Sequence, residues 1–256
     1  MKLTLAALAP VVVVESWARG IGWIALLLAA IALAMAFTLL ARRPPREKSL
    51  PVATDLDAAI AATLVLLLLP AGTAWSIACL AVALAISVGR QAFGGLGQPL
   101  FHPAMVGLAL TGLLWPAGMT APAWSGWAAA AVWIGGSALV LRGVLPWRLP
   151  SAFFAGALVA AAFMVPSEVS PVLRALAVAS DPSWELCAFF IAGDSTTACL
   201  HAGARLAFGI GAGVLVVLLS SWQPGIGLPL AMLLMNFTAP WLDQIDSTRR
   251  QKIRSP

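Results

Sequence analysis

Long runs of apolar residues without a charged side chain limit what this chain can fold into. Residues 21–40 contain no Asp, Glu, Lys or Arg, and several other runs are nearly as long. A helix of about 17–25 apolar residues crosses the hydrocarbon core of a bilayer. The runs do not alternate between apolar and polar residues, as half-buried strands do, so they favour helices. The sequence therefore predicts an all-α protein that crosses a membrane several times.

The overall composition excludes a water-soluble globular domain. Hydrophobic residues make up 61% of the 256 residues and charged residues only 10%, whereas soluble domains carry roughly 45–50% and 25%. Too few polar side chains remain to cover a core against water. We therefore expect residues 1–256 to form a single membrane domain, with the lipid bilayer as its surroundings.

Glycine and proline divide the apolar runs into about ten predicted transmembrane helices. An N-terminus inside the cell then places 13 of the 15 Lys and Arg residues on the cytoplasmic side and leaves Arg19 and Arg174 outside. Basic residues concentrate in cytoplasmic loops, so this separation predicts that both termini are cytoplasmic, with residues 244–256 as a basic tail. The net charge of +5 reflects these anchors, and no nucleic-acid partner is expected. The predicted helices cover residues 3–14, 21–41, 56–69, 74–88, 104–114, 125–141, 151–164, 186–200, 206–219 and 228–242, and the longest outside loop covers 166–185.

The segment GGLGQPLFHPAMVG, residues 94–107, is unlike a plain transmembrane helix. Irregular backbone at membrane depth is tolerated where protein covers it or where it lines a cavity. Glycine also lets a flat ligand approach the main chain closely. One interpretation is a re-entrant turn that serves packing alone. The other is a cofactor site formed by Gly94, Gly95, Gly97, Phe101, His102 and Pro103.

A second irregular segment, AFFIAGDSTTACLHAGAR, places Asp194 inside an apolar run. A carboxylate within the membrane is costly and usually faces a cavity or a partner. Ser195, Thr196 and Thr197 are expected to cap a half-helix that begins near Asp194. The functional interpretation is an ion or proton site, and the structural one is a cap paired with Arg205 or a backbone amide.

Asp55 and Asp57 open the third predicted helix, which is short, as is the eighth, acidic helix. Carboxylates in a first helical turn are ordinary partners of the helix dipole. Two halves that each contain an interrupted third helix also fit inverted repeats with a site between them. We expect two inverted five-helix repeats with broken or re-entrant segments, at about residues 1–114 and 125–243. The candidate residues for ion or proton coupling are Asp55, Asp57, Asp194 and Thr196.

No metal site and no catalytic residue is predicted. His102 and His201 are the only histidines, and neither has a second His or Cys at a metal-ligand spacing. The string GIGAG at residues 209–213 follows no strand, so it indicates packing by small residues and not a dinucleotide loop.

Three segments resemble motifs of the RnfD/NqrB family of membrane subunits. The first, RQAFGGLGQPLFHPAMVG at residues 90–107, is similar to the family pattern GGLGxNxFNPA followed by a helix. The second, FFIAGDSTTA at 189–198, resembles FFIATDP. The third, WQPGIGLPLAMLLMNFTAPWLD at 222–243, resembles the last helix of the family, with Asn236 and Pro240 at familiar positions. The aspartates before the third helix also match, and the resemblance covers nearly the whole chain in order.

The resemblance implies a ten-helix inverted-repeat fold in the bacterial inner membrane. It also implies a role within a complex, beside other membrane subunits, that passes electrons through flavins while moving Na⁺ or H⁺. The chain would then be a subunit of an ion-translocating oxidoreductase and not an enzyme alone. Two alternatives stay open, namely a channel or transporter for small solutes or ions without redox activity, and a scaffold subunit without cofactors.

The chain departs from the family where a flavin is attached. Typical members carry FMN covalently on a threonine in the outside loop between helices five and six, at the end of a motif like Ser-Gly-Ala-Thr. Here that loop is WPAGMTAPAWSGW, in which Trp127 follows Ser125-Gly126 and Thr120 lacks the acidic neighbour. We therefore predict no covalent FMN and leave a non-covalent flavin, riboflavin or FMN. His102 also replaces the asparagine of the first motif.

Overall fold

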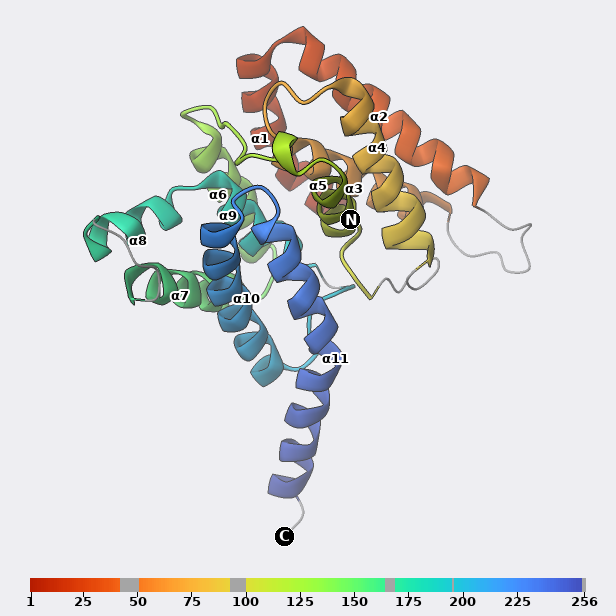
Figure 1. Ribbon diagram of the computed structural model, residues 1–256. Coiled ribbons are helices and arrows are strands. Elements are labelled where there is room, and N and C mark those ends of the chain that lie inside the picture. The colour runs from red at the N-terminus through yellow and green to blue at the C-terminus, as the bar shows by residue number, and fades with distance from the viewer. Residues whose placement is uncertain (42–50, 93–99, 164–168, 195, 255–256) are drawn as a thin grey trace.

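The computed structural model describes residues 1–41, 51–92, 100–163, 169–194 and 196–254, with the backbone alone described at 51–55 and 249–254. This part of the chain is helical throughout and contains no strand. The predicted all-α class is therefore confirmed. Figure 1 shows the helices gathered in one bundle, with the last helix projecting from it toward the C-terminus.

The first half of the chain forms a compact group of helices, one of which changes from α-helical to π-helical geometry along its length. Gly20, at φ 78°, makes the sharp turn between the first two helices, a conformation that suits glycine. The fourth helix passes directly into a π-helical segment, and π-helical turns are frequent at functional sites. The elements are α1 (Lys2–Arg19), α2 (Ile21–Leu40), α3 (Pro51–Leu68), α4 (Trp75–Leu84), η1 (Ala85–Ala92) and α5 (Pro103–Leu114).

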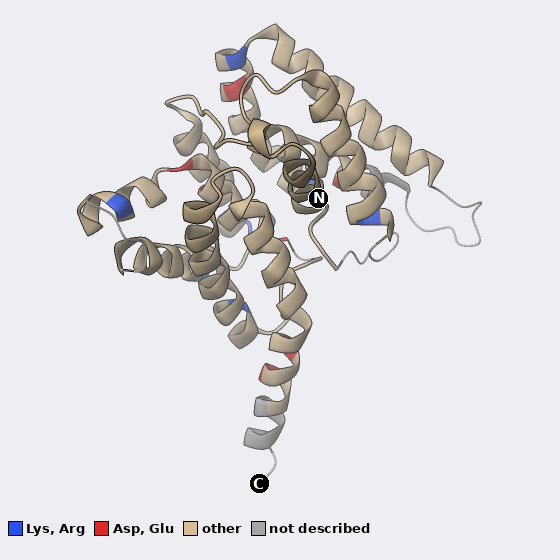
Figure 2. Cartoon of the chain, in the orientation of Figure 1, with Lys and Arg blue, Asp and Glu red and all other residues tan. Residues whose placement is uncertain are grey.

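The second half contains the longest helices of the structure. The helix α10 lies along both α7 and α11, and α11 continues beyond the bundle (Figure 1). Few charged residues lie on the helices of the bundle, as Figure 2 shows. The elements are η2 (Pro116–Gly118), α6 (Ala128–Leu141), α7 (Arg148–Phe163), α8 (Pro171–Ala179), α9 (Pro182–Leu186), η3 (Cys187–Ile191), α10 (Ala202–Trp222) and α11 (Gly227–Arg254).

Three described helices are long and apolar enough to cross a membrane by themselves: α2, the continuous helix α4–η1, and α10. Shorter apolar helices cover Leu56–Leu68, Pro103–Leu114, Ala128–Leu141 and Arg148–Phe163. Several apolar helices in one chain fit a membrane protein that crosses the bilayer more than once. The short helices need neighbours at both ends, because unpaired backbone groups are costly in lipid.

Several predicted boundaries are wrong. The first helix ends at Arg19 and not at residue 14, α3 begins at Pro51, so that Asp55 and Asp57 do not open it, and α11 continues to Arg254. The helix expected at 186–200 ends at Ile191, and the residues around Asp194 form turns. Part of the loop expected at 166–185 instead forms α8. The signals for α8 are present in the sequence: Pro171 occupies the first helical turn, and the Ser170 hydroxyl accepts a bond from the Leu173 amide at 3.4 Å. Hydropathy does not register such capping signals, so a prediction based on apolar runs misses α8.

Glycine permits a very close contact between two helices of the second half. A Cβ at Gly213 of α10 would overlap the carbonyl oxygen of Phe153 on α7. Helices in membranes associate through such small residues, because burial from lipid supplies little driving force. The packing of α7 on α10 therefore depends on the absence of a side chain at residue 213.

We expect Gly213→Ala to lower the thermal stability of the purified protein in detergent, because α7 and α10 must move apart. Overpacking of this kind costs about 1–3 kcal/mol. Gly22→Ala is the matched control, since Gly22 also lies within a helix but has nothing within 4 Å of a built Cβ. Equal melting temperatures for the two variants, measured by fluorescence-detected size exclusion after heating, would contradict this packing.

Candidate functional site

A small cavity of about 100 Å³ lies where the two halves of the chain meet. It contains several of the polar residues that the sequence singled out, from α3, the start of α5 and the turn after η3. Its polar lining consists of Thr4, Asp57, His102, Asp194 and Thr196, and apolar residues of α6, η3 and the segment before α7 complete the wall. The start of α1 also reaches it, through Met1.

Asp57 of α3 is paired with a buried arginine. The Nη2 atom of Arg90, on η1, lies 3.6 Å from the Asp57 Oδ2 atom. The Arg90 side chain is 4% exposed, and its Nη1 atom donates to the Thr38 hydroxyl of α2 at 3.4 Å. A buried charge is strongly destabilising when its partner is removed. The pair therefore fixes η1 against α2 and α3 and balances the charge of Asp57.

His102 lies directly before α5 and is 4% exposed. The following Pro103 occupies the first helical position and holds His102 in an extended conformation, at φ −64° and ψ 121°. The His102 Nε2 atom lies 4.0 Å from Asp194 Oδ2. The other ring nitrogen, Nδ1, is buried and has no hydrogen-bond partner within the described ranges. A buried polar atom without a partner requires an explanation.

Asp194 belongs to a tight turn and does not begin a half-helix. Its Oδ1 atom accepts from the Thr196 amide at 3.2 Å, and its Oδ2 atom accepts from the Thr196 hydroxyl at 2.6 Å. This is an Asx-type turn, in which the side chain replaces helical backbone bonds. The predicted half-helix is wrong, and so is the predicted pairing with Arg205, whose Nε atom donates to the Cys199 carbonyl at 2.8 Å. The alternative of a backbone amide partner is correct.

Asp243 of α11 holds the residues that connect the Asp194 turn to the start of α10. Its carboxylate accepts from the backbone amides of Leu200 and His201, at 2.8 and 2.9 Å, and from the His201 Nδ1 atom at 2.9 Å. Asp243 follows the apolar part of α11. Partial burial raises the pKa of this carboxyl, but these hydrogen bonds outweigh that effect, and the pKa lies below its ordinary value. The arrangement ties the start of α10, and with it the Asp194 turn, to α11.

The structure brings together residues for which the sequence had predicted two different roles. Asp57, Asp194 and Thr196, predicted for coupling, line one cavity with His102 and Pro103, predicted for a cofactor. Phe101 precedes His102 but does not line this cavity. Gly94, Gly95, Gly97 and Ser195 lie outside the described residues, and only the backbone of Asp55 is described.

Sequence reasoning missed the partner of Asp57. Arg90 had been counted as a cytoplasmic anchor, whereas its side chain is buried against Asp57 and Thr38. The one signal in the sequence for a buried Arg90 side chain is its position at the end of an apolar run. Met1 and Thr4 were also missed, because nothing in the sequence indicates that the start of α1 reaches the cavity.

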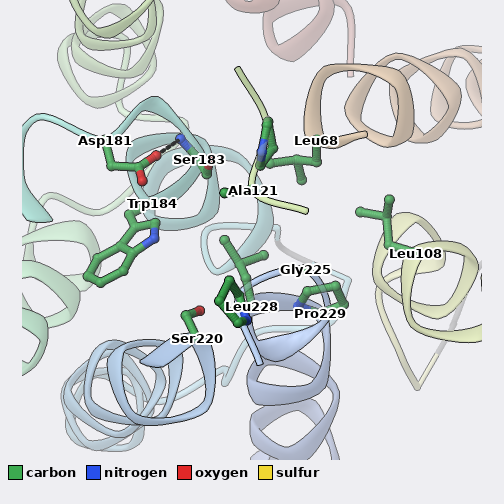
Figure 3. Close-up of a pocket in the computed structure, with 12 residues that line it drawn as sticks. Leu68, Leu108, Ala121, Asp181, Ser183, Trp184, Ser220, Gly225, Leu228 and Pro229 are labelled. Atoms are coloured by element: carbon green, nitrogen blue, oxygen red, sulfur yellow. Dashed lines mark hydrogen bonds between the residues drawn. The ribbon is translucent and has the colours of Figure 1, made fainter. Parts of the chain in front are cut away.

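A second cavity, of about 180 Å³, lies beside the end of α3 and the middle of α5 (Figure 3). Figure 3 shows Leu68 and Leu108 on one side of it and Asp181 with Trp184 on the other. The Asp181 Oδ1 atom accepts from the Ser183 amide at 2.8 Å, so this carboxylate caps α9. At a rise of 1.5 Å per residue, Leu68 lies about 16 Å along α3 from Asp57. The polar cluster belongs to the first cavity alone.

The loop before α6 is fastened to α1. The buried carboxylate of Glu15 accepts from the amide and the hydroxyl of Ser125, at 3.1 and 2.7 Å, and pairs with Arg19. Arg19 also donates to the Ala123 carbonyl at 3.1 Å. These contacts hold the short loop against the bundle. This is the loop that would carry the covalent flavin in the family it resembles.

The first cavity does not fit a flavin. Sites for organic ligands and cofactors occupy about 300–1,000 Å³, whereas this one is about 100 Å³. That volume holds several water molecules, each of which needs roughly 10–15 Å³ by the same kind of measure. The chemistry available to this cavity is therefore that of protons, water or a small ion.

Comparisons with known proteins agree with the motifs. The model of the NQR2, RnfD, RnfE family matches residues 1–130 and 123–252. A protein of Marinobacter nauticus, named as the D subunit of an ion-translocating oxidoreductase complex, is 29% identical over 262 residues, covering 76% of this chain and 74% of its own. A protein of Ectopseudomonas mendocina with the same name is 28% identical, covering 100% of this chain and 92% of its own. That alignment runs over 327 positions, so this relative contains segments that the present chain lacks.

We expect Asp243→Asn to destabilise the protein by about 0.5–2 kcal/mol near neutral pH, since a charged acceptor of several hydrogen bonds is lost. The pKa of this carboxyl is lower in the folded state than in the unfolded chain. Its stabilisation is therefore complete above the unfolded value of about 3.9 and is lost as the pH falls through the folded value.

Thermal unfolding in detergent across this pH range measures the effect, with Ser247→Ala as the control on the same helix. The Ser247 hydroxyl is exposed and bonds only to the Gln244 carbonyl of its own helix. A stability difference for Asp243→Asn that stays the same from neutral pH down to the lowest pH at which both proteins remain folded would contradict the assignment.

Proposed function

Because this chain belongs to the NQR2, RnfD, RnfE family, we propose that it is an integral membrane subunit of an ion-translocating electron-transfer complex. The relatives that carry the name of such a subunit align with up to the whole chain. The name also implies other membrane subunits as partners. The chain contributes to the oxidoreductase as part of the assembly and does not act as an enzyme alone.

One observation supports a direct role in coupling redox chemistry to Na⁺ or H⁺ movement. Two acidic side chains and a histidine from distant parts of the sequence line one cavity between helices, in a bundle that otherwise contains few charges. Ionisable groups inside a membrane protein are costly and typically mark ion or proton paths. Asp57, Asp194 and Thr196 are the proposed coupling residues.

The proposed architecture is ten transmembrane segments in two inverted repeats. In this count α4 with η1 is one segment, α9 with η3 is one, and α8 does not cross. The contacts support it: α1, first in its half, packs on α6, and α5, last in its half, packs on α11. The third segment of each half also brings an acid to the cavity, Asp57 from α3 and Asp194 after η3. An odd number of helices per half gives the halves opposite orientations.

The proposed location is the bacterial inner membrane, with both termini in the cytoplasm. The distribution of basic residues supports this orientation. In this proposed orientation the first cavity, which Met1 lines, faces the cytoplasmic side. The second cavity, beside the loops before α6 and α9, then lies toward the outside.

Any flavin is proposed to bind without a covalent bond, outside the first cavity. The glycine-rich segment at 94–97 is the proposed contact. The cavity itself is too small for a flavin ring system, so no step of the coupling is assigned to a flavin at His102. The scaffold and channel alternatives are less well supported. The side chains of Leu64 and Leu67 on α3 and of Met105 on α5 are fully buried.

We expect the protein purified with its partners to release its flavin on denaturation, because the loop at 115–127 lacks an attachment motif. The polypeptide band of this chain should then show no flavin fluorescence in a denaturing gel, while the supernatant does. A fluorescent band at the mass of this chain would show that covalent attachment occurs.

We expect Asp194→Asn to reduce ion movement by the reconstituted complex at least tenfold, because the variant keeps the shape of the turn but loses the charge. Proteoliposomes supplied with an artificial electron donor, a pH-sensitive dye and radioactive Na⁺ measure both ions. Asp181→Asn is the control, since that carboxylate caps α9 at the other cavity. Normal ion movement in Asp194→Asn would remove this residue from the coupling path.

A further inference from the structure

We propose that the ion handled by the Asp57–His102–Asp194 cavity is a proton, and that His102 is the residue that passes it to Asp194. This deepens the proposed function and rests on it. The observation behind it is the His102 imidazole, which is almost wholly buried, with one nitrogen 4.0 Å from a carboxylate and the other without a hydrogen-bond partner among the described residues.

The charged groups around His102 come from four elements. Asp57 belongs to α3, Asp194 follows η3, the amino group of Met1 begins α1, and Arg90 of η1 is held by Asp57. The rest of the lining is apolar or hydroxyl-bearing. The two acidic groups are thus not equivalent, because Asp57 already has a permanently charged partner. His102 is the one ion-pair partner that the described residues offer Asp194.

The donor set is poor for a metal cation. Hard cations are bound by shells of oxygen ligands. Both carboxylate oxygens of Asp194 already accept from Thr196, and the Asp57 Oδ2 atom lies beside the Arg90 guanidinium. The nearby guanidinium repels Na⁺, and the imidazole supplies no oxygen ligand. A proton requires only one nitrogen lone pair.

The step follows from the two nitrogens of imidazole. A neutral ring that carries its hydrogen on Nε2 accepts a proton at Nδ1 and becomes imidazolium, which the Asp194 carboxylate stabilises. The Nε2 proton then passes to the Asp194 Oδ2 atom, leaving a neutral ring with its hydrogen on Nδ1 and a carboxylic acid. The distance of 4.0 Å exceeds a direct hydrogen bond. One bridging water, for which the cavity has room, connects the two groups.

The test uses the whole complex in proteoliposomes without Na⁺, with the pH-sensitive dye as the readout. We expect His102→Asn and His102→Gln to reduce electron-driven H⁺ movement at least tenfold, since neither amide takes up a proton. Asparagine fills the same position in the family pattern, so the turn into α5 should be kept. His201→Asn is the matched control, because His201 lies at the Asp243 cap and not in the cavity, and it should leave H⁺ movement within twofold.

The outcomes separate the inference from the proposed function. Radioactive Na⁺ uptake by the unmodified complex, undiminished by a protonophore and by His102→Asn, would overturn the proton assignment while the coupling function stands. Electron transfer without movement of either ion would defeat the coupling function itself.

A second measurement does not depend on activity. The pH-difference infrared spectrum of the full-length chain in lipid should contain imidazole and carboxylic acid bands that His102→Asn removes together. Retention of the carboxylic acid change in the variant would show that Asp194 takes its proton by another route.

Discussion

The ion pair between Arg90 and Asp57 is the interaction on which the arrangement of the site depends. Lipid supplies no water to solvate a guanidinium, so this buried group must find its partners inside the protein. It finds Asp57 on α3 and Thr38 on α2, and these contacts fix the position of η1. Gly89, the residue before Arg90, lies so close to Pro103 that a Cβ at Gly89 would approach the Pro103 Cα atom at 2.9 Å. That contact fixes the position of α5, and hence of His102.

Much of the bundle could be predicted from the sequence, because apolar runs without charges have few alternatives to helices. The position of Asp194 outside a regular helix could be suspected from the sequence, since a carboxylate within an apolar run demands a reason, whereas the third helix is longer than predicted and begins at Pro51. The end of η3 at Ile191 could not, because the Asx turn of Asp194 competes with helix through local hydrogen bonds that hydropathy does not register. The helix α8 was missed for the same reason.

A local reading of the sequence could not predict that Asp57, His102 and Asp194 share one cavity. Each residue looks like an isolated polar interruption, and each has an ordinary explanation when taken alone, as a helix-dipole partner, a turn residue or a cap. Their shared cavity arises from the packing of the two halves. Because partners so distant in sequence leave no local pattern, His102 was grouped with the glycines beside it and not with the acids across the bundle.

Each half of the chain brings one carboxylate to the cavity, Asp57 or Asp194, and the two carboxylates have different partners. In the first half a permanent cation neutralises Asp57. In the second half Arg205 donates to the Cys199 carbonyl, and the described partners of Asp194 are the neutral donors of Thr196 and the His102 imidazole. A permanent cation favours the ionised form of a neighbouring carboxyl, whereas an imidazole can both take up and release a proton. The two carboxylates of the cavity therefore differ in their partners, and this difference is why the proposed proton transfer is assigned to Asp194 and not to Asp57.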